Sequence, residues 1–486
     1  MKKWNQPSEP FPQQGTGRKL LGLMLVGAVI LASGAAYYWY HGPRAARAEV
    51  DPVSGFLERA ARKQRGGDSV GAVIEYSKAL ELHPDDERAL AGRAAVLLEE
   101  AEYGRAAGDL TALLQQQPDH REHYLARGRA YRESDDHRAA EADFRKAIEL
   151  DPELADGYVG RGRARLANGN VPGAIEDFTA ALRICPADPE VLRRRGDAYR
   201  LLGDNTAAMA DYDEAVRLDP DDARAFHKRA IARRALGDLS GAISDYNRVI
   251  HLGAREPAVY YNRANAKRAA GNIRGAIIDY SETLRLEPQD PEALFDRADC
   301  YKVLGQTRRA IADLTRVIEL APERATAYAA RADAKSAYGD LSGAIADYNR
   351  VVALEPGNHQ AFCSRARIKS LIGDTAGAIT DYNQALRVQP DSAPAFCGRG
   401  MAWLRDGELD RALADLDRAI ELSPDYMYAY RCRGEVKVIA ADVDGAISDF
   451  RAVVNRSTDR DLVRVANEYL AELEPFGPAG GGHRLP

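Results

Sequence analysis

A period of 34 residues runs through most of this 486-residue chain. One alanine recurs at every step of this period and serves as the marker residue of its unit. Twelve positions before this alanine stands Ala or Gly, and twelve positions after it stands proline in ten of twelve units, Ala254 and Thr458 being the exceptions. A period of this length indicates one supersecondary unit that stacks on copies of itself, because a single unit cannot bury its apolar face alone. The marker residues are twelve alanines without a gap: Ala72, Ala106, Ala140, Ala174, Ala208, Ala242, Ala276, Ala310, Ala344, Ala378, Ala412 and Ala446.

Each unit is predicted to form two helices joined by a tight turn. Two apolar-periodic runs of about a dozen residues are split by a Gly-Asp or Gly-Asn pair, such as Gly203-Asp204. Glycine supplies the left-handed conformation that ends a helix, and the Asp or Asn caps the next one. Small residues at the eighth and twentieth positions let the paired helices approach closely, and an aromatic residue or leucine at the twenty-fourth, such as Tyr246, fills the space between pairs.

The residues at these positions resemble the tetratricopeptide repeat, a 34-residue helix–turn–helix unit. The resemblance covers residues 53–460 in twelve units and implies an all-α fold, a right-handed α-solenoid whose first helices line the concave face. An aromatic content of only 7% also suits closely packed helices better than a β-sandwich. An amphipathic segment at residues 461–474 is expected to cap the array, ahead of a Gly/Pro-rich tail at residues 475–486.

The start of the chain carries a candidate membrane anchor. Residues 20–40 contain no charge, and a helix of that length crosses the hydrocarbon core of a bilayer. The sequence therefore predicts a single transmembrane helix, a signal anchor, between a basic disordered tail at residues 1–19 and a linker at residues 41–52. The positive-inside rule places the N-terminus in the cytoplasm and the repeats on the far, periplasmic or extracytoplasmic, side of the membrane.

Two observations leave alternatives open for this anchor. The apolar run Leu20–Ala32, followed by Ser33-Gly34, also fits a signal peptide that is cleaved. The chain has five cysteines without CxxC spacing, and free cysteines are more at home in a reducing compartment. Cleavage at residues 20–40 and the side that the repeats face are therefore both undecided at this stage.

Two opposite charges recur in step along the repeats. The seventh position is Arg in all twelve units, and the twenty-third is Asp in eleven and Glu75 in the first. The planar fork of arginine can bind a carboxylate through two hydrogen bonds, so we expect a structural ladder that joins the first helix of each unit to the second. Its central members are Arg195, Arg229, Arg263, Asp211, Asp245 and Asp279.

The sequence contains no motif that would support catalysis. HExxH, GxxxxGK[ST] and a strand-followed GxGxxG are all missing from the sequence. The cysteines have no histidine at zinc-ligand spacing. We therefore predict a protein that is not an enzyme and that has no cofactor and no metal site.

The first helices are basic, although the net charge of the whole chain is −6. A basic groove attracts acidic partner segments and speeds their encounter. The alternative is that these charges only keep alanine-rich helices soluble. The chaperone-tail clamp of the family, with Lys and Asn at the fifth and ninth positions, is not reproduced. The candidate partner-binding residues lie in the fifth to seventh units: Arg193, Arg194, Arg200, His227, Lys228, Arg234, Tyr261, Asn265 and Arg268.

From these features we expect a membrane-anchored scaffold that binds extended or helical segments of other proteins, in the assembly of an envelope or secretion complex. One alternative is a regulatory or adaptor subunit of a membrane-associated enzyme. Another is the binding of a polyanion, either an acidic polysaccharide or a nucleic acid, although the stacking aromatics that nucleic acid needs are sparse. Self-association through the ends of the array is also open.

Overall fold

The computed structural model describes residues 52–473. The regular elements in that range are all α-helices, twenty-five in number. The predicted transmembrane helix at residues 20–40 lies outside the described residues, as do the basic tail and the Gly/Pro-rich tail. Within residues 52–473, none of the helices combines the length and the apolar character needed to cross a membrane.

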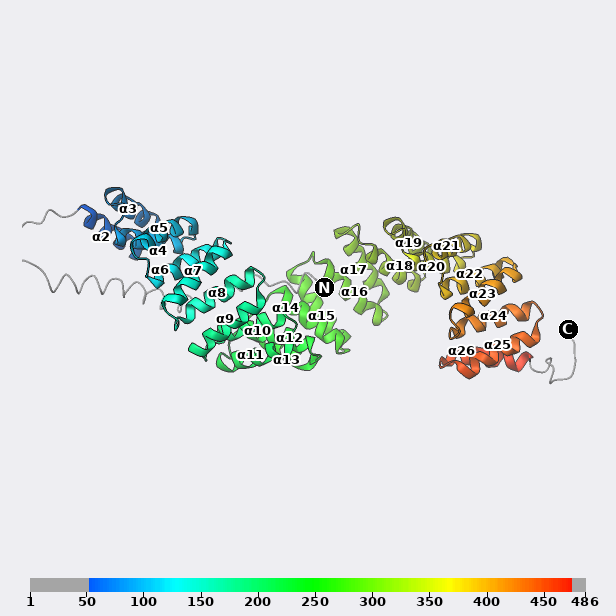
Figure 1. Ribbon diagram of the computed structural model, residues 1–486. Helices are drawn as coiled ribbons and strands as arrows, with labels where there is room; N and C mark the ends of the chain where they lie inside the picture. The colour runs from blue at the N-terminus through cyan, green and yellow to red at the C-terminus, as the bar shows by residue number, and fades with distance from the viewer. Residues whose placement is uncertain (1–51, 474–486) are drawn as a thin grey trace, which may run out of the picture. The chain divides into compact units, whose positions relative to one another are not determined.

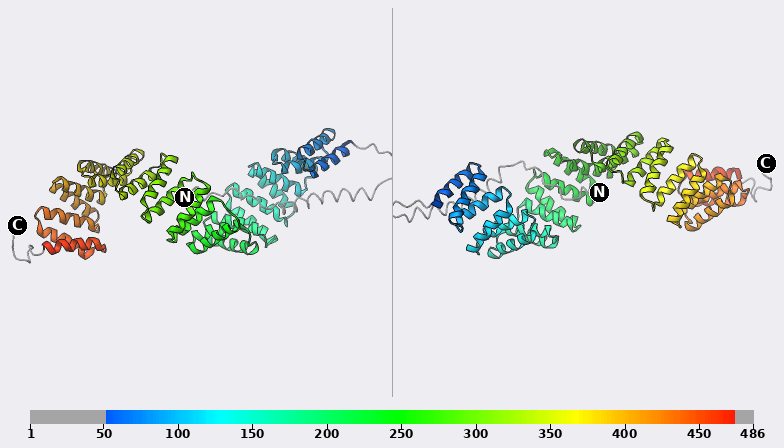
Figure 2. Two further views of the ribbon diagram at one scale, coloured as in Figure 1. Left: turned by 180° about the vertical axis from the view of Figure 1, so that it is seen from behind. Right: turned by 90° about the horizontal axis from the view of Figure 1, so that it is seen from above.

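The chain divides into two compact units, of which the N-terminal unit ends at Ala270. Its helices lie side by side in chain order, and each packs against the next (Figures 1 and 2). Even-numbered helices are the first helices of the predicted repeats, and odd-numbered ones are the second helices. The helices of this unit are α2 (Pro52–Arg65), α3 (Ser69–Leu82), α4 (Glu87–Glu99), α5 (Tyr103–Gln116), α6 (Arg121–Glu133), α7 (His137–Leu150), α8 (Ala155–Ala167), α9 (Val171–Ile184), α10 (Pro189–Leu201), α11 (Asn205–Leu218), α12 (Ala223–Ala235), α13 (Leu239–His251) and α14 (Pro257–Ala269).

The C-terminal unit begins at Gly271 and follows the same alternation of first and second helices. Its helices are α15 (Ile273–Leu286), α16 (Pro291–Val303), α17 (Thr307–Leu320), α18 (Ala325–Tyr338), α19 (Leu341–Leu354), α20 (His359–Leu371), α21 (Thr375–Val388), α22 (Ala393–Asp406), α23 (Leu409–Leu422), α24 (Met427–Ile439), α25 (Val443–Arg456) and α26 (Arg460–Leu473).

The turn between the two helices of a repeat has the geometry that the sequence predicts. Gly203 closes α10 with a left-handed φ of 83°, and the Asp204 side chain then accepts a hydrogen bond from the Ala207 amide at the start of α11. Three repeats place another residue at the glycine position, and its φ stays left-handed: 60° at Ala101, 62° at Asp135 and 61° at Ala441. The turn conformation is therefore kept even where it strains a side chain.

Small residues allow the helices to pack closely around the aromatic residue of each repeat. Phe144 on α7 is fully buried. A Cβ atom added at Gly160 on α8 would lie only 2.4 Å from its ring, and one added at Gly128 on α6 would lie 3.1 Å away. A larger side chain at either glycine would push the helices apart. The aromatic residue thus fills the space between its own repeat and the first helix of the next.

The last helix closes the C-terminal unit. We expected a cap at residues 461–474, and α26 spans Arg460–Leu473. It buries Ala466, Leu470 and Leu473 against the preceding repeat, and the ring of Tyr469 stacks on Phe450 with centroids 4.6 Å apart. Its opposite face is polar, so α26 covers the apolar edge that the last pair of helices would otherwise expose.

Candidate binding surface on the first helices

The predicted partner-binding residues lie on three neighbouring first helices of the N-terminal unit. Helix α10 contacts α12, and α12 contacts α14. We call the nine predicted side chains on these helices the first-helix surface. They are Arg193, Arg194 and Arg200 on α10, His227, Lys228 and Arg234 on α12, and Tyr261, Asn265 and Arg268 on α14.

Three of the cations on this surface are paired with carboxylates. Arg193 Nε lies 3.4 Å from Asp222 Oδ2, and Lys228 Nζ lies 3.5 Å from Asp197 Oδ1. Arg194 is bound to Glu190, one turn earlier on α10, with Nε donating to Oε1 at 3.0 Å. These pairs reduce the charge that the surface offers to a partner.

Two residues of the set belong to the packing between helices. His227 and Tyr261 are almost fully buried. Burial lowers the pKa of His227 to about 4, and the nearby charge of Lys228 acts in the same direction. Its imidazole is therefore neutral at pH 7, with its ring 5.8 Å from that of Tyr246. The half-buried Asn265 and Arg268 complete the surface on α14.

The remaining two arginines, Arg200 and Arg234, form no ion pair within the described part of the chain. Both are half-buried, and the Nε atom of each is enclosed without a hydrogen-bond acceptor among residues 52–473. The hydroxyl of the fully buried Tyr246 on α13 also lacks a partner there. Buried polar atoms in folded proteins are almost always hydrogen-bonded, so these unmatched donors, together with Arg193 Nε, make this surface a candidate binding site.

Of the three central pairs of the predicted ladder, the structure brings two together within the N-terminal unit. Arg195 donates from Nε to Asp211 Oδ2 at 2.9 Å and from Nη2 to Oδ1 at 2.7 Å. Arg229 makes the same two-pronged contact with Asp245. The third central pair is divided between the units: Arg263 belongs to the N-terminal unit, and Asp279, which is buried, belongs to the C-terminal unit.

The ladder arginines also reach the preceding repeat, which we did not predict. The third guanidinium nitrogen, Nη1, donates to a polar side chain sixteen residues earlier on the second helix of that repeat. The column of short polar residues at the twenty-fifth position was a signal for this contact. The pairs are Arg93–Ser77, Arg127–Thr111, Arg195–Thr179, Arg229–Asp213, Arg263–Asn247, Arg297–Ser281, Arg331–Thr315, Arg365–Asn349, Arg399–Asn383 and Arg433–Asp417.

A second cation binds the same carboxylate in several repeats, and this was also missed. It stands four residues after the ladder arginine, one helical turn along the first helix. Arg233 Nη1, for example, lies 2.9 Å from Asp245 Oδ2. The pairs are Lys63–Glu75, Arg165–Asp177, Arg233–Asp245, Lys335–Asp347, Lys369–Asp381 and Lys437–Asp449.

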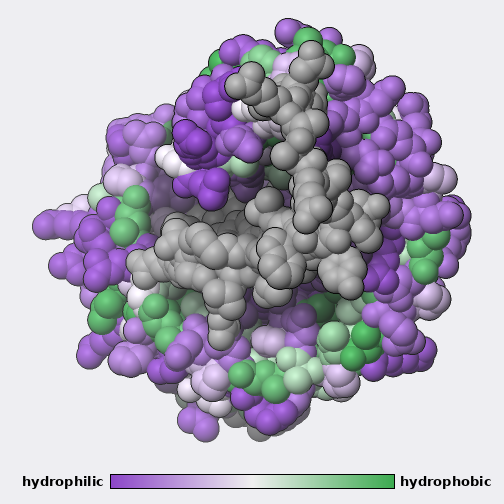
Figure 3. All heavy atoms as spheres, turned by 90° about the vertical axis from the view of Figure 1, so that its left-hand side faces the viewer, coloured by the Kyte–Doolittle hydropathy of each residue, from purple (hydrophilic) through white to green (hydrophobic). Residues whose placement is uncertain are grey.

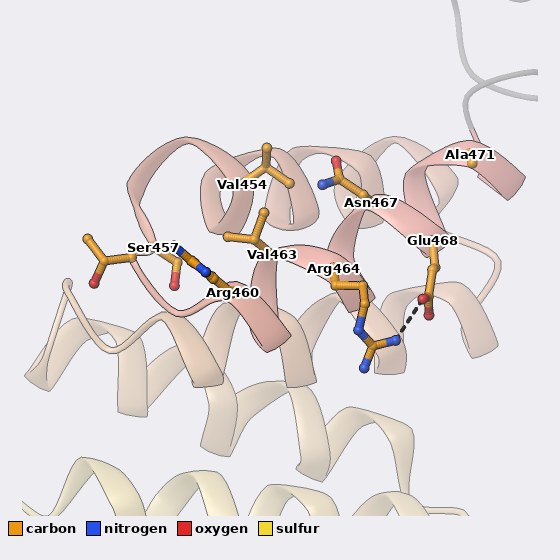
Figure 4. Close-up of a pocket in the computed structure, with 9 residues that line it drawn as sticks. Val454, Ser457, Arg460, Val463, Arg464, Asn467, Glu468 and Ala471 are labelled. Carbon is orange, nitrogen blue, oxygen red and sulfur yellow. Dashed lines mark hydrogen bonds and ion pairs between the residues drawn. The ribbon is translucent and has the colours of Figure 1, made fainter.

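The other surface features of the described chain are weaker candidates for a binding site. A depression between α25 and α26 is lined by Val454, Val463, Asn467 and an Arg464–Glu468 ion pair (Figure 4). Its polar side chains are matched or open to solvent, as befits the outer side of a capping helix. The face of the molecule in Figure 3 is mostly hydrophilic, with hydrophobic residues in small separate patches. Among residues 52–473, no cluster of His, Cys, Asp and Glu side chains could hold a metal ion.

Comparison with known families agrees with the repeat pattern. Models described as "Tetratricopeptide repeat" match residues 93–155, 125–189, 261–305, 372–426 and 292–324, and one described as "TPR repeat" matches residues 196–233. Together with the helix pairs described above, these matches show the class of protein. The chain contains tetratricopeptide repeats, and its described part is an all-α helical-repeat solenoid; the number of twelve remains a prediction.

Solved structures of other repeat proteins are similar to parts or most of the chain. The crystal structure of the MamA protein is 24% identical over 35% of this chain and 92% of its own, with a TM-score of 0.34. Yeast Tom70 is 15% identical, covering 88% of this chain and 97% of its own at a TM-score of 0.37. The APC/C hetero-tetramer Cut9-Hcn1 is 13% identical, covering 87% and 96% at 0.41. These likenesses concern the fold only. No curated protein sequence matches the chain.

Proposed function

We propose that this chain is a non-enzymatic scaffold that binds segments of partner proteins on its first-helix surface. Tetratricopeptide-repeat proteins generally mediate protein–protein interactions and scaffolding. The observation that supports this location is the excess of donors on α10 and α12: Arg200 and Arg234 have no carboxylate partner there, whereas the ladder arginines are saturated. A surface with spare, positioned cations favours a partner segment that carries acidic groups.

We further propose that the scaffold is tethered to a membrane through residues 20–40 and acts in the assembly of a membrane or envelope complex. The support for this part comes from the uncharged 21-residue stretch and the basic residues before it. A reporter fused after residue 486, assayed by protease accessibility in intact and permeabilised cells, determines which side the repeats face. A reporter that is digested only after the cytoplasmic membrane has been permeabilised would contradict the proposed orientation.

The binding surface is tested by crosslinking in cells followed by affinity purification. The variant Arg200→Glu/Arg234→Glu reverses the two spare charges. The control Arg138→Glu/Arg183→Glu makes the same charge change at exposed arginines of the second helices α7 and α9, which form no ion pair in the described chain. We expect specific proteins to be recovered with the wild type and the control, and to be lost with the first variant. Recovery of the same proteins with all three would refute the proposed surface.

A further inference from the structure

Three tyrosines at the twenty-fourth repeat position direct their hydroxyls at the first helix of their own repeat. Tyr212 donates to Asp197 Oδ1 at 2.8 Å, fifteen residues earlier, and Tyr348 donates to Asp333 across the same interval at 2.5 Å. Tyr76 donates to Gln64 Oε1 at 3.3 Å, twelve residues earlier. In each of these repeats the ninth or twelfth position of the first helix therefore supplies a hydrogen-bond acceptor.

The repeat that contains Tyr246 lacks this acceptor. Fifteen residues before Tyr246 stands Ile231, and twelve before it stands Arg234. Isoleucine has no polar atom, and a guanidinium only donates. Tyr246 is fully buried, and its hydroxyl has no partner in the described chain. Burial raises the pKa of this phenol, and the charge of Arg234 acts in the opposite direction, as expected for close neighbours.

No acceptor in residues 52–473 pairs with the Tyr246 hydroxyl or with Arg234 Nε. In the preceding repeat, Asp197 Oδ1 accepts from Tyr212 and lies 3.5 Å from Lys228 Nζ. Arg200, on α10, adds a further buried Nε without an acceptor. Tyr246 and Arg234 therefore each keep an unmatched donor, and the effect of the Arg234 charge on the pKa of the Tyr246 phenol shows that the two groups are neighbours. Arg234 is only half-buried, whereas Tyr246 is fully buried, so a ligand reaches the guanidinium of Arg234 before the hydroxyl of Tyr246.

We propose that Arg234 and Tyr246, assisted by Arg200, form a recess that receives one anionic oxygen group, a carboxylate or a phosphoryl group, carried by a partner segment on the first-helix surface. This inference rests on the proposed function and adds the chemistry of one anchoring contact. The recess is built from the twelfth and twenty-fourth repeat positions. It thus differs from the fifth and ninth positions of the family's chaperone-tail clamp, where this chain has His227 and Ile231 in the same repeat.

The preceding repeat suggests the decisive variant. Ile231→Asp places a carboxylate where Asp197 stands one repeat earlier, and so supplies Tyr246 and Arg234 with an internal acceptor. This carboxylate should occupy the recess and exclude an external anion. Tyr246→Phe removes one donor without adding charge. Tyr348→Phe is the matched control, because it removes a hydroxyl that already has an acceptor, in the C-terminal unit.

Inorganic phosphate and acetate serve as probes, titrated into the full-length chain by calorimetry at constant ionic strength. We expect the wild type and Tyr348→Phe to bind at least one of them, and Ile231→Asp and Tyr246→Phe to bind it about tenfold more weakly or worse. The anion that binds shows whether the group is a phosphoryl or a carboxylate. Should Ile231→Asp alter the helical circular dichroism, Ile231→Asn supplies the acceptor without the charge.

Equal binding by the wild type and Ile231→Asp, or no binding of either anion by the wild type, would overturn the recess. Capture of partner proteins separates this outcome from failure of the proposed function. If Ile231→Asp still captures the same proteins in crosslinking, the recess is wrong while the scaffold stands. If the wild type captures no specific protein, the scaffold itself is refuted.

Discussion

Arg229 and Asp245 join the two helices of one repeat through two parallel hydrogen bonds, from Nε to Oδ2 at 2.9 Å and from Nη2 to Oδ1 at 2.7 Å. The remaining nitrogen, Nη1, donates to Asp213 on α11 at 2.8 Å, so one guanidinium connects three helices. Arg233 adds a second cation at 2.9 Å from the Asp245 carboxylate. Because this arrangement recurs in most of the repeats, the ladder joins the two helices of a repeat and links that repeat to the one before it.

Removing the central carboxylate is expected to destabilise the fold strongly. Asp245→Ala leaves Arg229 and Arg233 without their shared partner, and only 4% of the Asp245 side chain is exposed. Loss of one partner of a buried pair costs about 3–5 kcal/mol in the free energy of unfolding. Urea titration of the full chain, followed by circular dichroism, measures this loss.

The matched control for that measurement is Asp213→Ala, which removes the exposed acceptor of the same arginine. Its expected cost is below about 1 kcal/mol, because exposed ion pairs contribute little. Similar small losses for both variants would show that the ladder does not stabilise the fold.

The turn at Ala441 is expected to gain stability from glycine. Ala441 has a left-handed φ of 61°, whereas most repeats place glycine at this point. Because a left-handed conformation costs a residue with a Cβ about 1–2 kcal/mol, Ala441→Gly should raise the free energy of unfolding by about 1 kcal/mol. Ala440→Gly, one residue earlier at a φ of −79°, should lower it by about 0.5–1 kcal/mol. Thermal melting of both variants beside the wild type checks the opposite signs, and the same sign for both would contradict the turn geometry.

The two central tyrosines should respond differently to loss of the hydroxyl. Tyr212→Phe breaks the hydrogen bond to Asp197 and is expected to cost about 1 kcal/mol in the free energy of unfolding. Tyr246→Phe removes a buried hydroxyl that has no partner, so it should leave stability unchanged or increase it slightly. Urea midpoints measured in the absence of phosphate and carboxylate buffers make the comparison. Equal losses for the two variants would mean that Tyr246 has an acceptor in the free protein.

The buried imidazole of His227 makes the fold sensitive to mild acid. Its pKa is about 4 in the folded chain because of burial, with Lys228 adding to the effect, against an ordinary value near 6.5. Between these values the unfolded chain binds a proton that the folded chain does not. The stability that this neutral histidine contributes is therefore fully present above about pH 6.5 and is lost as the pH falls toward 4.

Proton NMR titration of the His227 ring measures this pKa directly, with His227→Gln used to assign the signal. A midpoint near 6.5 would contradict the burial seen for this ring. The stability difference between the wild type and His227→Gln should also shrink from pH 7 to pH 4.

The repeat pattern predicted the fold well because each recurring position is set by local geometry: glycine at the turn, small residues where helices meet, and an aromatic residue between repeats. The Arg–Asp pairing within a repeat was equally accessible, since both charges recur in one unit. The contact of Arg229 with Asp213 was missed because its partner belongs to the preceding repeat. The burial of His227 and Tyr261 depends on side chains from neighbouring helices, which a periodicity does not specify. The unmatched hydroxyl of Tyr246 could be recognised only from the structure. One sign of it is visible in the sequence, because Ile231 stands where the preceding repeat has Asp197.

The central claim, that partners bind on the first-helix surface, is tested most directly by site-specific photocrosslinking in cells. A photoreactive residue is placed at the exposed Ala235 on α12, next to Arg234, or, as the reference, at the exposed Arg183 on the second helix α9. We predict that the Ala235 position captures a defined partner and that the Arg183 position does not. Capture of the same protein with equal yield from both positions, or only from Arg183, would contradict the account.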